Sequence, residues 1–190
     1  MTVQSLRRRF TVDEYHKMMD AHIFQEDDRV ELLDGEIHNM SPIDAAHASM
    51  VKRLNQYLQQ WIGTRAIVSV QDPVTLDDYS APQPDLAILR ARDDFYEDHH
   101  PLPADTLLVI EVANTSAHVD RTEKLPRYAV AGIPEVWIVN IKQRVVEQYT
   151  QPDGKVYVNR KLIKRGLLTT TCITPALELP VERIFGQKLS

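Results

Sequence analysis

The stretch DTLLVIEVA, residues 105–113, constrains the fold more than any other part of the sequence. Its apolar run predicts a β-strand over Leu107–Ala113, in which alternate side chains point to opposite faces. Glu111 shares one face with Leu107, Val109 and Ala113, and the other face is wholly apolar. Such a nearly continuous apolar run is typical of a central strand that is covered on both sides. We therefore expect a layered protein with helices on both faces of a sheet.

Turn and capping signals divide the rest of the chain into further elements. Thr11 and Glu14 form a capping-box pattern, and Asp34-Gly35 has the preference for positive φ that a tight hairpin turn needs. The predicted helices are Val12–Ala21, a helix from Asp44 to Ile62 that Gly63 ends in an αL conformation, Asp120–Ala131 and Val181–Phe185. The predicted strands, besides the central one, are Arg29–Leu33, Glu36–Ser41, Ala66–Val70, Val74–Leu76, Asp85–Leu89, Glu135–Ile141, Val145–Thr150, Lys155–Arg160 and Leu167–Ile173. This order predicts one α/β (α+β) domain over residues 1–190 with a mixed sheet, preceded by an arm of about ten residues.

Composition excludes several classes of protein. With 22 Lys and Arg against 27 Asp and Glu, the net charge of −5 excludes indiscriminate coating of nucleic acid, although a local basic groove is still allowed. A single cysteine, Cys172, excludes an intrachain disulfide and a cysteine-cluster metal site. Apolar runs are too short to span a membrane, and the N-terminus lacks the pattern of a secretory signal. We expect a soluble, cytoplasmic protein.

Two acidic residues break the local pattern. Glu111 lies in the apolar central strand, where a carboxylate is costly unless it gains a cation or a proton. The alternative is that Glu111 sits at a frayed strand end and meets water. Asp85 begins the apolar stretch DLAIL directly after Pro84, and the alternative there is an ordinary strand-start aspartate.

The two acids gain meaning as a pair. They are 26 residues apart, which is enough for a strand, a reversal and a return. If their strands are neighbours, the carboxylates converge and need a counter-charge. A hard divalent cation is the natural one, since Mg²⁺ binds one or two carboxylates together with water and phosphate oxygens.

Three further positions have a functional and a simpler interpretation. Lys124 lies on the helix after the central strand and could reach the same cleft, or it forms a surface i,i+4 ion pair with Asp120. Glu31 could belong to the site, or it faces solvent on a half-exposed hairpin. His47, on the first turns of the long helix, either caps that helix or faces a cleft.

Five segments in this order resemble a known family. They are RVELLDGEI, SPIDAAHASMV, PQPDLAIL, LLVIEVANTS and DRTEKLPRYAVAGIPEVWIVN. Together they resemble the small nucleases of the PD-(D/E)XK superfamily known as the Uma-two type, over nearly the whole chain from Thr11 to about Phe185. The resemblance implies a restriction-endonuclease-like mixed β-sheet flanked by helices.

The resemblance also assigns roles to residues. It implies that Pro84-Asp85 is the PD element and that Glu111 is the (D/E) element, with a backbone carbonyl near Val112 completing the metal ligands. The usual lysine is replaced by Ala113, and Lys124 from the following helix is its implied substitute. The same resemblance matches Glu31 to an additional acid that binds metal through water or binds a second ion, and matches His47 and Asp120 to supporting polar positions. Asn114 and Gln83 depart from the family pattern, which bears on metal or substrate preference.

The function implied by the resemblance is hydrolysis of phosphodiester bonds assisted by Mg²⁺ or Mn²⁺. Nucleic acid is the implied partner, with DNA as the first expectation and RNA as the alternative, and a homodimer is allowed. A positioned acid or base contributes roughly 10²–10⁴-fold in rate, so the larger part of the acceleration needs charge stabilisation of the kind a metal ion supplies. One competing interpretation is a non-catalytic binding or assembly module that retains the fold. Another is a hydrolase of a different phosphate ester.

Overall fold

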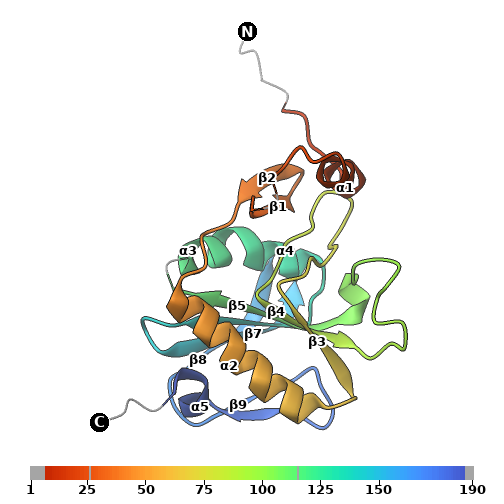
Figure 1. Cartoon of the computed structure of the whole chain (residues 1–190). Helices are drawn as coiled ribbons and strands as arrows, with labels where there is room; N and C mark the ends of the chain where they lie inside the picture. Colours follow the sequence, from red (N-terminus) through yellow and green to blue (C-terminus); the bar gives the residue numbers. More distant parts are fainter. Residues whose placement is uncertain (1–6, 26, 115, 187–190) are drawn as a thin grey trace.

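A six-stranded mixed sheet forms the centre of the molecule, as the computed structural model of residues 7–25, 27–114 and 116–186 shows (Figure 1). Its order is β3-β4-β5-β6-β7-β8, and only β5 and β6 run parallel. The strands are β3 (Ala66–Val70), β4 (Leu86–Arg90), β5 (Thr106–Ala113), β6 (Glu135–Asn140), β7 (Val145–Asp153) and β8 (Val156–Ile163). The central apolar run is thus β5, an interior strand, and the α/β fold predicted from it is confirmed.

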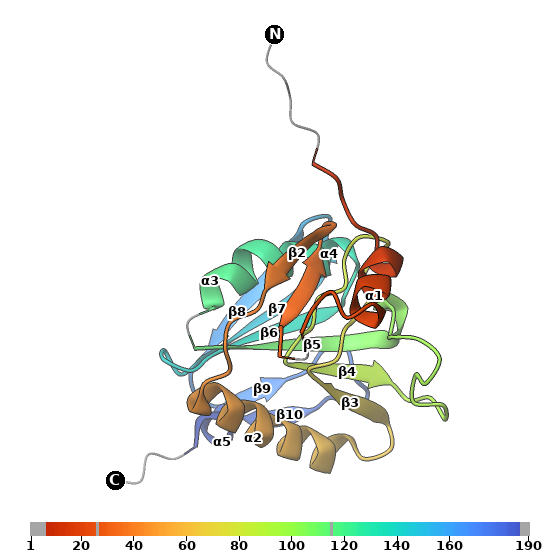
Figure 2. The same cartoon turned by 45° about the horizontal axis from the view of Figure 1, so that its top comes forward.

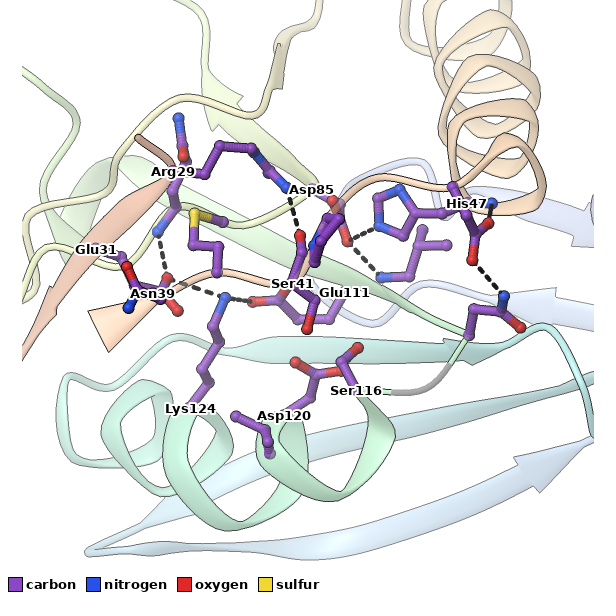
Figure 3. Close-up of a pocket in the computed structure, with 17 residues that line it drawn as sticks. Arg29, Glu31, Asn39, Ser41, His47, Asp85, Glu111, Ser116, Asp120 and Lys124 are labelled. Atoms are coloured by element: carbon purple, nitrogen blue, oxygen red, sulfur yellow. Dashed lines mark hydrogen bonds and ion pairs between the residues drawn. The ribbon is translucent and has the colours of Figure 1, made fainter. Parts of the chain in front are cut away.

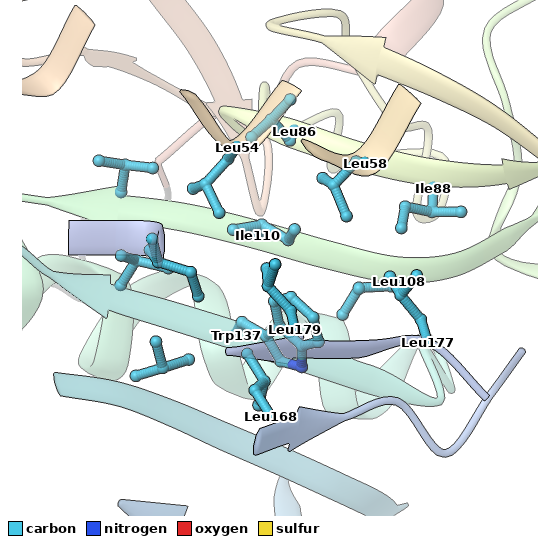
Figure 4. Close-up of a cluster of buried hydrophobic side chains, with 14 of the residues drawn as sticks. Leu54, Leu58, Leu86, Ile88, Leu108, Ile110, Trp137, Leu168, Leu177 and Leu179 are labelled. Carbon is cyan, nitrogen blue, oxygen red and sulfur yellow. The ribbon is translucent and has the colours of Figure 1, made fainter. Parts of the chain in front are cut away.

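Helices cover both faces of this sheet. On one face, α2 (Ala45–Ile62) packs with α5 (Val181–Phe185) and the small pair β9 (Leu167–Thr169) and β10 (Glu178–Pro180). Figure 4 shows Leu54 and Leu58 of α2 against Ile110 of β5. On the other face, Val109 and Ala113 of β5 pack with Tyr128. As predicted, alternate side chains of β5 therefore point to opposite faces of the sheet, and each set belongs to a different core.

The N-terminal unit lies outside the main sheet. It consists of α1 (Val12–Asp20), capped by the predicted Thr11–Glu14 box, and the hairpin β1 (Val30–Leu33) and β2 (Glu36–Asn39). Asp34 and Gly35 both have positive φ, 51° and 78°, as a type I′ turn requires. A Cβ on Gly35 would lie 2.6 Å from that of Arg9. The hairpin is attached to the loop before β4 by a bridge between Leu32 and Ala81 (Figure 2).

The helix predicted over Asp120–Ala131 differs from the prediction. It begins earlier, as α3 (Ala117–Val119), widens into the π-helical segment η2 (Asp120–Lys124), and continues as α4 (Leu125–Val130). The amide of Leu125 donates to the carbonyl of Asp120, five residues back. Pro126 explains the change, because it has no amide hydrogen and its ring would clash with the carbonyl four residues earlier.

Smaller corrections concern strand ends and one helix end. Val74–Leu76 is not a strand and is held by loop contacts. The predicted last strand, Leu167–Ile173, ends at Thr169, and β10 pairs with it. Gly63 has φ 55° and ψ −127°, which is outside the αL region. A 3₁₀ turn, Pro103–Asp105, precedes β5. The first six residues of the predicted arm lie outside the described residues, and no helix in the described part of the chain is long and apolar enough to cross a membrane.

Candidate active site

A cavity of about 130 Å³ lies where the hairpin, the N-terminus of α2, the strands β4 and β5, and the α3–η2 helix meet (Figure 3). Every residue singled out from the sequence as a site residue lines it. These residues are Glu31, His47, Asp85, Glu111, Val112, Asp120 and Lys124. Segments far apart in the sequence therefore converge at one place, and the chemical role of each residue stays a prediction.

Asp85 directly precedes β4, and Glu111 lies in the neighbouring strand β5. β4 and β5 are antiparallel with Leu86 opposite Ile110, so the two carboxylates are delivered to the same end of the sheet. Glu111 is only 3% exposed, and the alternative of a frayed strand end in water is wrong. The convergence expected from the 26-residue spacing is the observed arrangement.

The carboxylate of Asp85 is fixed by three donors. Its Oδ2 accepts the Val112 amide hydrogen at 2.8 Å and lies 3.0 Å from Nε2 of His47. Its Oδ1 accepts a hydrogen bond from Nε2 of Gln71 at 3.2 Å. The hydrogen bond to Asp85 is the largest influence on His47 and raises the pKa of the imidazole, while burial opposes it. His47 therefore faces the cleft and holds Asp85. This agrees with the interpretation of His47 as a cleft residue.

Lys124 bridges two acids instead of forming a surface pair. Its Nζ lies 3.0 Å from Oε2 of Glu31 and 3.4 Å from Oε1 of Glu111, and its side chain is only 7% exposed. Within the described residues it makes no ion pair with Asp120, so the surface-pair interpretation is wrong. Burial lowers the pKa of Lys124, but the surrounding carboxylates, Glu111 first, outweigh burial and keep the pKa above its ordinary value.

Glu31 is buried because the loop before β4 covers the hairpin. Its Oε2 accepts the backbone amide hydrogen of Gln83 at 3.0 Å as well as contacting Lys124. The bridge between Leu32 and Ala81 holds this loop against β1. The solvent-facing interpretation of Glu31 fails, since a hairpin that looks half-exposed from its own sequence is covered by a distant segment.

Two acids of the cavity, Glu111 and Asp120, have raised pKa values. Burial is the main cause that raises the pKa of Glu111 to about 8, with Lys124 opposing it. Burial likewise raises the pKa of Asp120 to about 6, although Ser116 donates a hydrogen bond to it at 2.9 Å. The hydroxyl of Tyr128 donates to Oε1 of Glu111 at 2.7 Å. A raised pKa favours the protonated form of Glu111 near neutral pH, and a divalent cation would favour its ionised form.

The carboxylates of this cavity are suitable ligands for a hard divalent cation. No set of three or more His, Cys, Asp and Glu side chains is arranged to hold a metal in the parts of the chain that the structure describes. Mg²⁺ does not require such a set, because it keeps water and substrate oxygens as ligands beside one or two carboxylates. Asp85 and Glu111 supply two carboxylates in a cavity with an acidic surplus. The Val112 amide hydrogen binds Asp85, and metal binding by the Val112 carbonyl stays a prediction.

Three contributors were missed from the sequence. Tyr128 had a signal, because it shares a helical face with Asp120 and Lys124. Gln71 and Ser116 had none, since a loop glutamine and a loop serine are common and their contacts arise only from the folded arrangement. Gln83, noted as a departure from the family pattern, acts through its backbone amide.

Comparisons with known proteins agree with this architecture. A family model described as "Putative restriction endonuclease" (Uma2) matches residues 12–182. A crystal structure described as a putative nuclease belonging to DUF820, from Anabaena variabilis ATCC 29413, superposes with a TM-score of 0.69 at 14% identity, covering 93% of this chain and 97% of that one. At this identity the likeness shows the fold. No curated protein matches the chain. The family match extends over most of the sequence, so the chain belongs to the Uma2 family, as its motifs indicated.

Proposed function

We propose that the protein is an endonuclease that depends on a divalent metal ion and hydrolyses phosphodiester bonds of nucleic acid, with DNA as the first candidate. One observation carries the proposal: a carboxylate at the start of β4, a carboxylate in the adjacent β5 and a buried lysine meet in a cavity whose acids exceed its cations. The family description and the nuclease fold support the same activity.

Asp85 and Glu111, with the Val112 carbonyl, would hold Mg²⁺ or Mn²⁺. Glu31 would contribute through water or bind a second ion. When bound, such an ion stabilises negative charge on the phosphate and makes water a better nucleophile. Hard oxygen ligands suit both ions.

The other residues place and charge these groups. Lys124, kept protonated by the acids around it, would orient the attacking water and stabilise charge that develops on the phosphate. Glu31 and Glu111 both contact the ammonium of this lysine. His47 positions Asp85, and Tyr128 positions Glu111. No side chain is needed as a covalent nucleophile.

Nicking of supercoiled plasmid tests this proposal. The wild-type protein should nick DNA with Mg²⁺ or Mn²⁺ and not with EDTA, and RNA assayed beside it identifies the preferred substrate. Glu111→Gln should reduce nicking by roughly 10²-fold or more, the scale of losing one group that stabilises charge in a transition state. Glu178→Gln, an exposed acid on β10, is the matched control and should cut like the wild type.

Thermal melts separate a nuclease from a non-catalytic module. A metal ion at 100 times its dissociation constant stabilises the fold by roughly 2.7 kcal/mol, and Glu111→Gln should abolish that gain. Absence of both cleavage and metal stabilisation in the wild-type protein would favour a binding or assembly module. Metal stabilisation without cleavage of DNA or RNA would favour a hydrolase of another phosphate ester.

A further inference from the structure

A second cavity, of about 670 Å³, lies between α2 and α5 on the far side of α2 from the catalytic cavity. Its lining is rich in cations: Lys52 and Arg53 come from α2 and Arg183 comes from α5. One acid, Glu182, lies among them, and its Oε1 already accepts the amide hydrogen of Gly166 at 3.0 Å. The groove is therefore locally positive in a chain whose net charge is −5.

The three cations of this groove are free to bind a ligand. None of them forms an ion pair within 4.0 Å of an acid in the described part of the chain, and Arg53 uses one nitrogen to donate to the carbonyl of Ile184 at 3.4 Å. Arg121, by contrast, is paired with Glu147. Converging cations without acidic partners are what a chain of phosphates requires.

The groove and the catalytic cavity share one helix. His47 and the N-cap Asp44 line the catalytic cavity, and Lys52 follows five residues later. At a rise of 1.5 Å per residue, that is about 7.5 Å along the helix axis. Lys52 also points to the other side of this helix, which is about 10 Å across, so a bound strand has to pass round the N-terminal turns of α2. Duplex DNA places a phosphate about every 3.4 Å along each strand, and roughly four nucleotides would span this path. Figures 1 and 2 both show α5 beside the N-terminal half of α2.

The opposite side of the catalytic cavity has the wrong charge for phosphates. A cavity of about 940 Å³ beside α1 shares Arg29 and Gln83 with the catalytic cavity. Its lining includes four exposed acids, which are Asp20, Asp28, Glu97 and Asp98. Like charges would repel a phosphodiester backbone there, so of these two sides the α2–α5 side is the more favourable for the substrate.

We propose that the α2–α5 groove, with Lys52, Arg53 and Arg183, binds the phosphodiester backbone of the substrate a few nucleotides from the bond that is cut. This inference rests on the proposed nuclease function and adds the surface that receives the substrate.

Binding of a fluorescent duplex oligonucleotide in EDTA, followed by anisotropy over a range of salt, tests the groove. The combined variant Lys52→Gln with Arg183→Gln should weaken binding about tenfold and lower the slope of log affinity against log salt by up to about 1.8, because each phosphate contact contributes about 0.9. Lys155→Gln with Lys161→Gln removes the same charge from exposed positions of the β7–β8 hairpin and is the matched control. It should leave the slope unchanged, and thermal melts should show that both variants are folded.

The outcomes separate this inference from the proposed function. Equal effects of the two double variants, or an unchanged slope in the groove variant, would overturn the groove assignment while plasmid nicking by the wild type still supported a nuclease. If wild-type protein bound neither DNA nor RNA and cut neither, the groove and the nuclease proposal would both fall.

Discussion

Lys124 is the residue on which the charge balance of the catalytic cavity depends most. Lys124→Met keeps much of the side-chain stem but leaves Glu31 and Glu111 buried without their shared cation. Removing one partner of a buried ion pair costs about 3–5 kcal/mol, so the metal-free variant should be destabilised by that order. Added Mg²⁺ should stabilise the variant more than it stabilises the wild type, because the ion replaces the missing cation. The nicking rate of the variant should fall by roughly 10²-fold. Urea unfolding with and without the ion, together with the nicking rate, measures both effects.

Lys124→Arg separates charge from shape. Arginine keeps a positive charge near Glu31, so stability should largely return, but its planar fork cannot replace the compact ammonium that contacts both Glu31 and Glu111. Nicking should therefore stay well below the wild-type rate. A Lys124→Met protein that cuts like wild type would contradict the role assigned to this lysine, and with Ala113 at the usual position the site would have no lysine.

Site residues were easiest to predict from the sequence where a charged residue interrupts or borders an apolar strand. Glu111 and Asp85 were predictable for that reason, because a carboxylate within or beside a buried strand has to find a partner. Lys124 and Glu31 were not predictable from periodicity, which favoured an exposed pair and a solvent-facing hairpin. Their burial depends on the loop before β4, which lies about fifty residues from the hairpin it covers.

At the scale of elements, the π-helical segment η2 decides how Lys124 reaches the strands. Arg121 in this segment is tied to the sheet: its Nε lies 3.1 Å from both carboxylate oxygens of Glu147 on β7. Widened helical turns of this kind often occur at functional sites. The wider turn was not foreseen, because the apolar spacing of residues 120–131 fits an ordinary helix and the effect of Pro126 on the turn before it is local geometry.

Arg121→Met tests whether this anchor positions the lysine. The variant should lower kcat for nicking several-fold, while metal binding, which depends on Asp85 and Glu111, stays close to wild type. Arg160→Met is the matched control, because Arg160 also binds Glu147, at 2.8 Å, but belongs to β8 and not to η2. Both variants should lose stability, and only the Arg121 variant should lose rate. Equal losses of rate in the two variants would mean that Arg121 has no specific part in positioning Lys124.

At the scale of the whole molecule, one sheet serves two purposes. The α2 face of β4 and β5 is sealed by aliphatic side chains, and the opposite face and the strand ends carry the acids. The strand order could be anticipated in part, since the run in β5 required an interior position. The placement of the N-terminal hairpin over the strand ends could not, because it depends on contacts between distant segments that leave no periodic signal.

This burial of acids predicts how stability changes with pH. The pKa of Glu111 is about 8 in the folded protein, against an ordinary value of 4.5, so between these values the folded chain holds a proton that the unfolded chain releases. Unfolding therefore becomes easier as pH rises through this window. In EDTA, the free energy of unfolding of the wild type should fall by a few kcal/mol between pH 5 and pH 8, as measured by urea unfolding.

Glu111→Gln removes the titrating group and should flatten this decline, although Asp120, with a pKa of about 6, leaves a smaller slope below neutral pH. Saturating Mg²⁺ should flatten the wild-type curve as well, because the ion takes the place of the proton, and apparent metal affinity should rise with pH over the same range. Parallel curves for the wild type and Glu111→Gln in EDTA would show that Glu111 is ionised in the metal-free fold. The ammonium of Lys124 would then offset the cost of burying an ionised Glu111, and no proton would compete with the divalent ion for this carboxylate.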